Sequence, residues 1–365
     1  MYNIPLCEPW FEPSYAEKVR GQILSGQIGP GPVTMEFARR LAAFAKAKYC
    51  VLTTSGTVAL SLAALALGLK PGDEILVPAY GVVSTINALA FLGLKPRLVD
   101  IDQTTGCMSP HELEKRITPQ TRGVCFVNFS GYTGQNLVQV AQICRARHLP
   151  LIEDAACALG HKFWGKSAGT FGTIGIYSFS VPKIITCGQG GALITNSATL
   201  FRKLSQLIDQ GDLNWRRTNL IHGIGSNFRF NDILAAFGLV QLGAIDKRIT
   251  RKKAVFAVFK KMLKRKIFQV PGAVPPLHQI VFTPKPHSLV KYLKRCGISG
   301  VRQYRTLSEH PPYANLSDRK FPAADFWTRY AVYLPFGLAL ETQDAQKIVK
   351  ALLTSGCKLL DIENL

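Results

Sequence analysis

The pattern of apolar and polar positions predicts two parts of the chain with different orders of elements. After a predicted helix at 13–25, short apolar runs rich in β-forming residues alternate with longer helical runs up to about residue 240. The predicted strands are 49–53, 74–78, 97–100, 123–129, 149–153, 173–179 and 192–195. Because helical runs separate these strands, the alternation predicts an α/β fold with a mostly parallel central sheet and helices on both faces.

The last third of the chain has a different pattern, in which prolines surround a single short strand-like run. Its predicted elements are a long helix at 232–266, a strand at 279–283, and helices at 288–296 and 342–355. We therefore expect a large domain over residues 1–245 and a smaller α+β domain over residues 246–365.

The composition is that of a globular protein, with 47% hydrophobic and 18% charged residues. The longest apolar run, 58–69, is shorter than the roughly 20 residues that span a bilayer. The first ten residues, MYNIPLCEPW, do not resemble a signal peptide. Nine cysteines without a CxxC pair are typical of free thiols in a reducing compartment, so we expect a cytoplasmic protein without disulfides or a metal site.

The net charge of +21 favours an anionic partner, although a basic solvated surface has the same signature. The run 251–266 contains eight basic residues in sixteen, with apolar residues at helical spacing between them. One interpretation is a helix that binds a membrane surface or nucleic acid. The preferred interpretation is a helix that links the domains, with its apolar stripe in the core and its lysines in water. We expect no nucleic-acid partner.

Two segments follow predicted strands and contain groups that bind ligands. The run 54–57, with Gly56 and Thr57, opens an apolar helix, and free N–H groups at a helix start bind phosphate. The strand 149–153 ends beside Asp154, where a buried carboxylate requires a cationic partner such as a protonated pyridine nitrogen. Each segment taken alone is also compatible with an ordinary helix cap.

Lys183 lies in an irregular apolar segment that is unlike a solvated helix face. Pro182 precedes it, and a glycine turn at 188–191 follows it. Burial lowers the pKa of an ammonium group, and a neutral amine is the nucleophile that attacks an aldehyde. A lysine on a surface loop is the alternative interpretation of this segment alone.

The order of these segments resembles the DegT/DnrJ/EryC1/StrS family of aminotransferases. The matching features are the SGT run, the strand ending in Asp154, the S-x-x-x-x-K run from Ser178 to Lys183 with its trailing glycines, and Asn227-Phe228-Arg229 before a helix. The resemblance covers nearly the whole chain. It implies the type I fold of transferases that depend on pyridoxal 5′-phosphate (PLP), in which PLP is the cofactor.

The resemblance also implies roles for individual residues. Lys183 is expected to form a Schiff base with PLP, and Asp154 to pair with the pyridine nitrogen. Gly56, Thr57 and Ser178 are expected to bind the cofactor phosphate. Asn227 matches an asparagine that reaches the phosphate from a partner subunit, so a homodimer with shared active sites is expected.

Two positions depart from the pattern of the family. Where the family has an aromatic residue stacked on the PLP ring, this chain has Val82; either Val82 packs on the ring or Tyr80 substitutes from two residues away. Cys157 occupies the position of a glutamine or histidine near the ring hydroxyl. These departures bear on the choice of substrate more than on the binding of PLP.

The resemblance implies a PLP-dependent aminotransferase that moves an amino group, with glutamate as the expected donor, to a nucleotide-linked keto-deoxysugar. The alternatives are a dehydratase or a cyclitol aminotransferase of the same fold, and a basic relative without transaminase activity that binds membranes or nucleic acid. In the dehydratase pattern a histidine replaces the lysine, so the presence of Lys183 argues for amino transfer.

Overall fold

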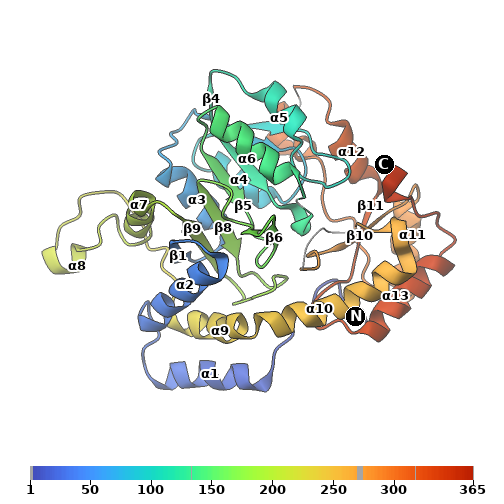
Figure 1. Ribbon diagram of the computed structural model, residues 1–365, viewed down its shortest axis with the longest axis horizontal. Coiled ribbons are helices and arrows are strands. Elements are labelled where there is room, and N and C mark those ends of the chain that lie inside the picture. The colour runs from blue at the N-terminus through green and yellow to red at the C-terminus, as the bar shows by residue number, and fades with distance from the viewer. Residues whose placement is uncertain (1–2, 133, 269–273, 317, 365) are drawn as a thin grey trace.

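A seven-stranded sheet forms the centre of the computed structural model, which describes residues 3–132, 134–268, 274–316 and 318–364. The strand order is β1-β9-β8-β5-β4-β2-β3, and β9 alone runs antiparallel to its neighbours (Figure 1). The strands are β1 (Tyr49–Thr53), β2 (Glu74–Pro78), β3 (Lys95–Val99), β4 (Thr121–Val127), β5 (Leu151–Asp154), β8 (Ile174–Ser178) and β9 (Gly191–Thr195). The predicted α/β class with a mostly parallel sheet is confirmed.

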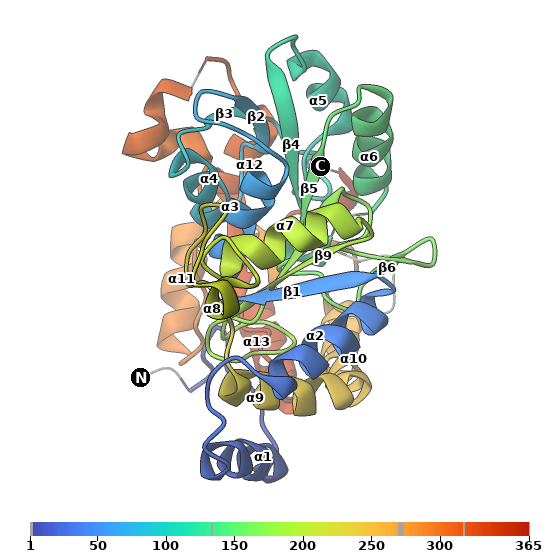
Figure 2. The same cartoon turned by 90° about the vertical axis from the view of Figure 1, so that its left-hand side faces the viewer.

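Helices cover both faces of this sheet (Figures 1 and 2). Helix α3 lies across β5, β8 and β9 and packs on α4 and α7, whereas α6 packs on α5 and contacts β4. Strands β5 and β9 are therefore buried along their whole length, which suits the largely apolar sequence of β9 and leaves the two carboxylates at the end of β5 away from water. The helices flanking the sheet are α2 (Pro32–Ala45), α3 (Gly56–Ala66), α4 (Val83–Ala90), α5 (Pro110–Arg116), α6 (Asn136–Ala146) and α7 (Ala198–Ile208).

The long helix predicted over 232–266 is wrong as a single element. The chain forms α9 (Asp232–Gly243) and α10 (Ile245–Leu263), separated at Ala244, whose φ of −101° and ψ of 15° are not helical. Helix α9 packs on α1 (Pro13–Leu24) and α2, whereas α10 packs on α13 (Thr342–Thr354). The two halves therefore have different packing partners, and the small residues at 243 and 244 allow the change of direction.

A second hydrophobic core lies where α10, α11 (Pro286–Arg295) and α13 meet the antiparallel pair β10 (Gln279–Phe282) and β11 (Ala331–Leu334). Ile4 belongs to this core, and Trp327 of α12 (Pro322–Tyr330) belongs to the core around the large sheet. Because each core draws residues from both sides of the expected boundary, the division at residue 246 stays a prediction.

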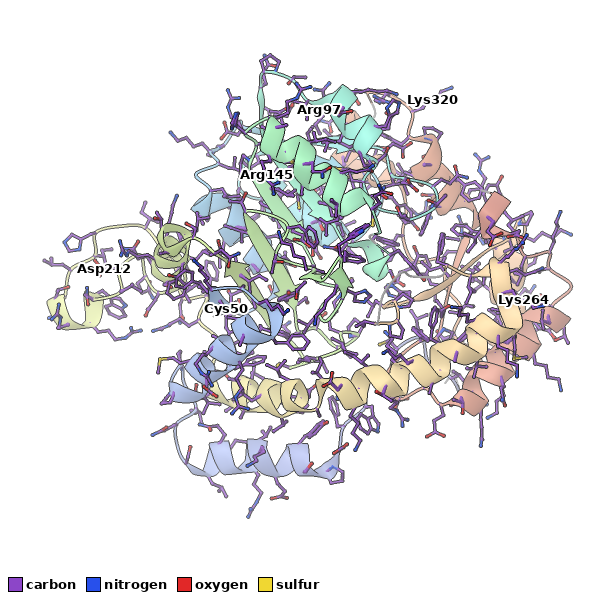
Figure 3. All side chains as sticks on the ribbon, in the orientation of Figure 1. Cys50, Arg97, Arg145, Asp212, Lys264 and Lys320 are labelled. Carbon is purple, nitrogen blue, oxygen red and sulfur yellow. The ribbon has the colours of Figure 1, made fainter. Side chains whose placement is uncertain are left out.

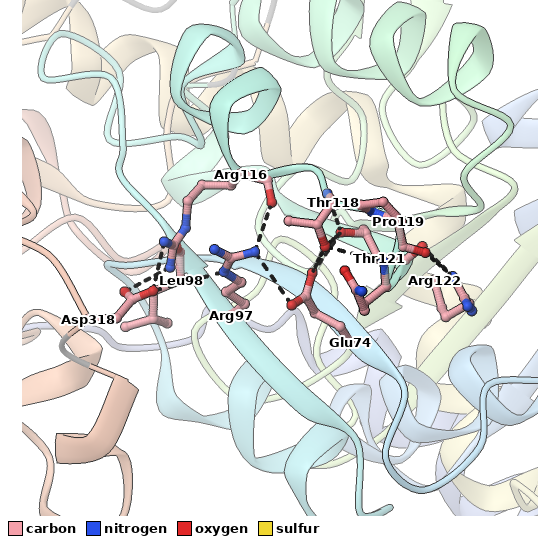
Figure 4. Close-up of polar contacts among 10 residues, drawn as sticks. Glu74, Arg97, Leu98, Arg116, Thr118, Pro119, Thr121, Arg122 and Asp318 are labelled. Carbon is pink, nitrogen blue, oxygen red and sulfur yellow. Dashed lines mark hydrogen bonds and ion pairs between the residues drawn. The ribbon is translucent and has the colours of Figure 1, made fainter.

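A polar cluster joins the C-terminal third of the chain to the edge of the large sheet (Figure 4). The Arg116 guanidinium is buried, donates to the Leu98 carbonyl at 2.9 Å and pairs with Asp318 at 2.8 Å. Arg97 on β3 lies between Asp318 and Glu74, at 3.9 and 3.5 Å. These contacts hold the segment before α12 against the sheet.

Two further elements project from the body. The hairpin of β6 (Lys162–Phe163) and β7 (Lys166–Ser167) follows β5. Residues 210–226, here called the arm, contain the short helix α8 (Trp215–Thr218) and extend beyond the sheet (Figure 1). Within the described ranges, none of the helices has the length and apolar character needed to cross a membrane.

Candidate active site

Lys183 lies in the turn that follows β8, on an irregular segment as expected. Its backbone N–H donates to the Ser180 carbonyl at 3.0 Å, and its side chain is half-buried. The Lys183 Nζ donates to the Cys157 Sγ at 3.1 Å. Among the described residues, no carboxylate forms an ion pair with this amine. A lysine without an ionic partner beside a buried strand end is suited to nucleophilic chemistry.

Asp154 ends β5 and is buried. Its Oδ2 accepts a hydrogen bond from the Thr85 hydroxyl at 3.0 Å, and its Oδ1 accepts one from the Ala156 N–H at 3.1 Å. Burial raises the pKa of Asp154, while the Ala156 N–H, the charge of Lys183 and the Thr85 hydroxyl act in the opposite direction. The carboxylate thus lacks a full ionic partner, and a cationic ligand group would stabilise its charged form.

Glu153 has a separate, structural function. Successive side chains of a strand point to opposite faces of a sheet, so Glu153 and Asp154 diverge. Glu153 is fully buried, and its two oxygens accept four hydrogen bonds: from the Asn128 amide at 3.0 Å and from the N–H groups of Gly169, Phe171 and Gly172 at 2.5, 2.7 and 3.1 Å. This carboxylate holds the loop before β8 against the sheet.

A cradle for an anion lies where α3 begins. Ser55 caps this helix by accepting from the Val58 N–H at 3.1 Å, and Gly56 and Thr57 are its first residues. A Cβ on Gly56 would lie 2.9 Å from the Ser178 Cβ and 3.2 Å from its Oγ. The helix start and the Ser178 hydroxyl therefore lie side by side, and N–H groups at a helix N-terminus bind anions.

The two candidates for a residue against the cofactor ring have different surroundings. Tyr80 is fully buried, its hydroxyl hydrogen-bonds to the Tyr333 hydroxyl at 2.7 Å, and its ring packs edge-on against Phe129 and Trp327. Val82 is half-buried at the start of α4, three residues before Thr85, whose hydroxyl binds Asp154. The Tyr80 ring is fully engaged in the core, so Val82 is the available residue.

Asn227 belongs to the segment that joins the arm to α9. It lies exposed at the base of the arm, where its side-chain oxygen accepts from the Arg229 Nε at 3.0 Å. Arg229 also pairs with Asp209 at 3.1 Å. Its exposed position next to the projecting arm is compatible with a contact to another molecule.

Sequence reasoning missed several residues around Lys183. Thr85 lies one helical turn after Val82, a spacing that could have identified it. His161 and Lys252 line a small cavity together with Cys157 and Lys183. Lys252 stands between two other basic residues in the sequence, so nothing in the local pattern indicated its burial. No group of three or more His, Cys, Asp or Glu within the described part of the chain is arranged to hold a metal ion.

Comparisons with known proteins agree on one family. The model of the DegT/DnrJ/EryC1/StrS aminotransferase family matches residues 12–353. The chain is 36% identical over 262 residues to a GDP-perosamine synthase of Escherichia coli O157:H7, covering 72% of this chain and 71% of that protein. It is 32% identical over 337 residues to a UDP-2-acetamido-2-deoxy-3-oxo-D-glucuronate aminotransferase of Pseudomonas aeruginosa, covering 90% and 92%. An aminotransferase of Streptoalloteichus hindustanus has a similar structure, with a TM-score of 0.91 and 25% identity over 96% of this chain and 98% of that one.

Proposed function

Because the chain belongs to the DegT/DnrJ/EryC1/StrS aminotransferase family, we propose that it transfers an amino group from glutamate to the keto carbon of a nucleotide-linked deoxysugar. The chain is a PLP-dependent transaminase. The names of its relatives support a sugar nucleotide as the acceptor, because both the GDP-linked and the UDP-linked examples carry one.

The residues present fit PLP. The buried Asp154 carboxylate requires a cation, and the protonated pyridine nitrogen is one. The start of α3 with Gly56, Thr57 and the Ser178 hydroxyl forms a cradle of the right chemistry for a phosphate. Val82 is then the residue that packs on the ring. When bound, the cofactor supplies an electron sink for the electrons released at the substrate carbon.

Lys183 is the residue that carries out proton transfer in this proposal. When PLP is bound, the Lys183 Nζ would hold the cofactor. As a free amine, the Nζ would take the proton from the substrate α-carbon and later return it, as a general base and then as a general acid. The Cys157 Sγ lies 3.1 Å from this Nζ and would be the neighbouring side chain when the cofactor is bound.

One observation carries the proposal: the Lys183 amine, which donates to the Cys157 thiol and forms no ion pair among the described residues, lies close enough to the buried strand-end Asp154 for its charge to lower the pKa of that carboxyl. Lys183 also opposes the dehydratase alternative, in whose pattern a histidine replaces the lysine. The lysines of α10 do not favour a binding protein either, because Val255, Phe259 and Leu263 are buried in the second core while Lys260 and Lys261 face water. The linking-helix interpretation fits, although Met262 is 40% exposed.

The charge of the protein is concentrated in its C-terminal third. Residues 246–365 contain 22 lysines and arginines against 8 aspartates and glutamates. Lys264 lies at the outer end of α10, on the side of the molecule opposite Asp212 in the arm (Figure 3). We interpret this excess of positive charge as a property of the solvated surface that attracts anionic substrates over a distance. This interpretation of the charge does not require the protein to associate with a membrane surface.

The experiment that tests the proposal replaces Lys183 by alanine. The purified variant is expected to lose the absorbance band of lysine-bound PLP and to form no pyridoxamine phosphate from glutamate. Lys358→Ala, at an exposed position, is the matched control and should retain both. A panel of nucleotide-linked 3-keto and 4-keto sugars then identifies the acceptor. Survival of the absorbance band in Lys183→Ala would refute the assignment.

We also propose a homodimer in which Asn227 completes the phosphate site of the partner. The arm exposes Leu220, Ile221 and Ile224, with exposed fractions of 61%, 63% and 94%, and such a group of apolar side chains is typical of an interface. Mixing Lys183→Ala with Asn227→Ala tests this idea. Each variant alone is expected to be inactive. Random exchange of subunits in an equal mixture makes half of the dimers heterodimers, each with one intact site of two, so about one quarter of all active sites are restored. No recovery would refute shared sites.

A further inference from the structure

The loop that carries Lys183 depends on side chains from elsewhere in the chain for part of its backbone pairing. This loop, residues 179–190, joins β8 to β9 and is irregular throughout. Ile185, Thr186 and Cys187 are buried, so the stretch just after Lys183 lies inside the protein. Buried N–H and C=O groups that lack the partners of a helix or a sheet must be paired by other groups.

Gln241, near the end of α9, pairs with both backbone groups of Thr186. Its Oε1 accepts from the Thr186 N–H at 3.0 Å, and its Nε2 donates to the Thr186 carbonyl at 2.7 Å. The same Nε2 donates to the Phe237 carbonyl of α9 at 2.9 Å, which orients the amide. Gln241 is fully buried. A neighbouring antiparallel strand exchanges two hydrogen bonds with one residue in this way, and here a side chain takes its place.

Arg248, in the first turn of α10, holds the same loop at a residue closer to Lys183. Its Nε donates to the Ile184 carbonyl at 2.7 Å, and its Nη1 donates to the Trp10 carbonyl at 2.9 Å. The side chain is fully buried, and among the described residues no carboxylate forms an ion pair with it. Burying a guanidinium without a carboxylate partner is costly. The gain lies in its rigid fork of donors, which joins the loop to the N-terminal segment.

Both side chains reach the loop from a packed framework. Helices α9 and α10 lie end to end beneath the large sheet in the view of Figure 1. Helix α9 packs on α1 and α2, and α10 packs on α13. The loop is therefore attached to two helices that different neighbours hold in place, one on each side of the break at Ala244.

We propose that Gln241 and Arg248 are positioning residues, a clamp on the loop after β8 that holds the Lys183 amine in place at the active site. The inference rests on the proposed function, in which Lys183 holds the cofactor and moves the proton. Burial of Ile185 also holds the loop, but hydrophobic packing is not directional, whereas hydrogen bonds are. A displacement of about 1 Å at a reacting group can slow a reaction about 100-fold, so a loop with a fixed backbone favours the reaction.

Methionine variants remove the clamp while keeping an unbranched side chain in its place. Gln241→Met and Arg248→Met lose every hydrogen-bonding group of the original side chain, whereas Arg248→Lys keeps one donor group. Arg116→Met is the matched control. Arg116 is also buried and donates to a backbone carbonyl, that of Leu98 at 2.9 Å, but it lies at the β3 edge of the sheet. Its loss also breaks the ion pair with Asp318, so the control includes a general loss of stability.

Two measurements on the PLP-loaded, full-length proteins follow the loop and its effect on the reaction. Hydrogen–deuterium exchange with mass spectrometry follows the amides of Lys183 and Cys187, which donate to carbonyls within the loop, and that of Thr186, which donates to Gln241. Stopped-flow absorbance follows the conversion of bound PLP to pyridoxamine phosphate by glutamate. It gives a limiting rate and a half-saturating glutamate concentration. Circular dichroism establishes that each variant is folded at the temperature used.

Loss of either clamp residue should loosen the loop and slow the reaction. Gln241→Met and Arg248→Met should exchange the loop amides about ten-fold faster than wild type. Their limiting rates should fall about ten-fold or more at an unchanged half-saturating glutamate concentration, because the clamp acts on the loop of Lys183 and not on the substrate. Arg248→Lys should recover part of the rate. Arg116→Met should match wild type in both measurements.

Three outcomes would overturn the proposal. The first is loop exchange at the wild-type rate in both methionine variants, and the second is a limiting rate that falls equally in Arg116→Met. The third is a Thr186 amide that exchanges in wild type as fast as an unprotected amide. This last measurement needs no variant, so the proposal can still be refuted if the methionine variants do not fold.

Reduction of the PLP-loaded wild type with borohydride tests the proposed function separately. Hydride addition to the C=N bond between cofactor and lysine fixes the cofactor on that lysine, which peptide mass mapping then identifies. A tag on another lysine would refute the role of Lys183 and the positioning proposal with it, even if the loop loosens in the variants. A tag on Lys183 with unchanged loop exchange and rates would overturn the clamp alone.

Discussion

Replacing Glu153 by glutamine is expected to destabilise the fold while leaving the cofactor chemistry in place. The carboxylate is fully buried and accepts four hydrogen bonds, three of them from the backbone of the loop at 169–172. Glutamine retains one oxygen and places an NH₂ group where the other oxygen was. That group cannot accept, so two donors lose their acceptor and face a third donor instead.

The size of the effect follows from these contacts. A hydrogen bond to a charged group contributes about 1.5–3 kcal/mol, so losing two of them costs about 3–6 kcal/mol. Removing a buried charge offsets part of this loss, which leaves a net destabilisation of about 3–5 kcal/mol. At about 2 °C per kcal/mol, the melting temperature should fall by roughly 6–10 °C.

The measurement is thermal unfolding of the PLP-loaded protein, followed by circular dichroism, together with the PLP absorbance spectrum at 20 °C. Glu17→Gln is the control, because Glu17 is exposed and its 3.8 Å pair with Arg20 contributes little. Glu153→Gln should melt early with an unchanged spectrum. A melting temperature within 2 °C of wild type would refute the proposed anchoring of the loop, and a lost spectrum at full stability would assign Glu153 to the site instead.

Two further predictions concern the phosphate cradle and the acid stability. Gly56→Ala adds a Cβ 2.9 Å from the Ser178 Cβ, so the affinity for PLP, measured by fluorescence quenching, should fall about ten-fold or more. The control is Gly21→Ala, whose new Cβ has no atom within 4 Å and which should bind PLP with the wild-type affinity. Equal PLP affinities of the two variants would contradict a phosphate cradle at Gly56. His278 has a pKa lowered by burial to about 3, below its ordinary 6.5, so the unfolded chain binds the proton that the folded chain does not. Its contribution to stability is therefore lost as pH falls from about 6.5 towards 3, at up to about 1.4 kcal/mol per pH unit. Urea denaturation should show that the free energy of unfolding of His278→Gln falls less steeply with decreasing pH over this range than that of wild type. His111→Gln, at an exposed position, should keep the wild-type dependence on pH. The same dependence in all three proteins would exclude a contribution of His278 to acid unfolding.

The central sheet could be predicted from the sequence because its strands are buried on both faces. β1 and β2 match their predicted bounds, since uninterrupted apolar runs between turn residues have only one interpretation in such a sheet. β11 escaped prediction because its four residues are stabilised by pairing with β10, a tertiary contact that the local pattern does not contain. The break at Ala244 was missed for a similar reason: alanine and glycine permit a change of direction there but do not require it.

Some residues of the candidate site could likewise be found from the sequence, and others could not. Lys183, Asp154 and Gly56 became candidates because their order along the chain resembles a known family; Asp154 ends β5 and Gly56 begins α3, whereas Lys183 lies in the irregular turn after β8. Lys252 could not, because a lysine between two basic residues is typically solvated, and tertiary contacts with Leu277 and Phe336 accompany its burial. The contribution of Asn227 to the phosphate site of a partner subunit stays a prediction, because it depends on a second chain.

The contacts of residues 4–8 with the C-terminal third of the chain have a consequence for the order in which the protein folds during synthesis. Ile4 bridges to Ile298, and the carbonyls of Leu6 and Glu8 accept from the N–H groups of Phe336 and Ala339. At elongation rates of about 5–20 residues per second, these early residues wait roughly 15–60 s before their partners are synthesised. The large sheet can complete itself in that interval. The second core therefore acquires Ile4 as a partner of Ile298 only after most of the chain has been synthesised.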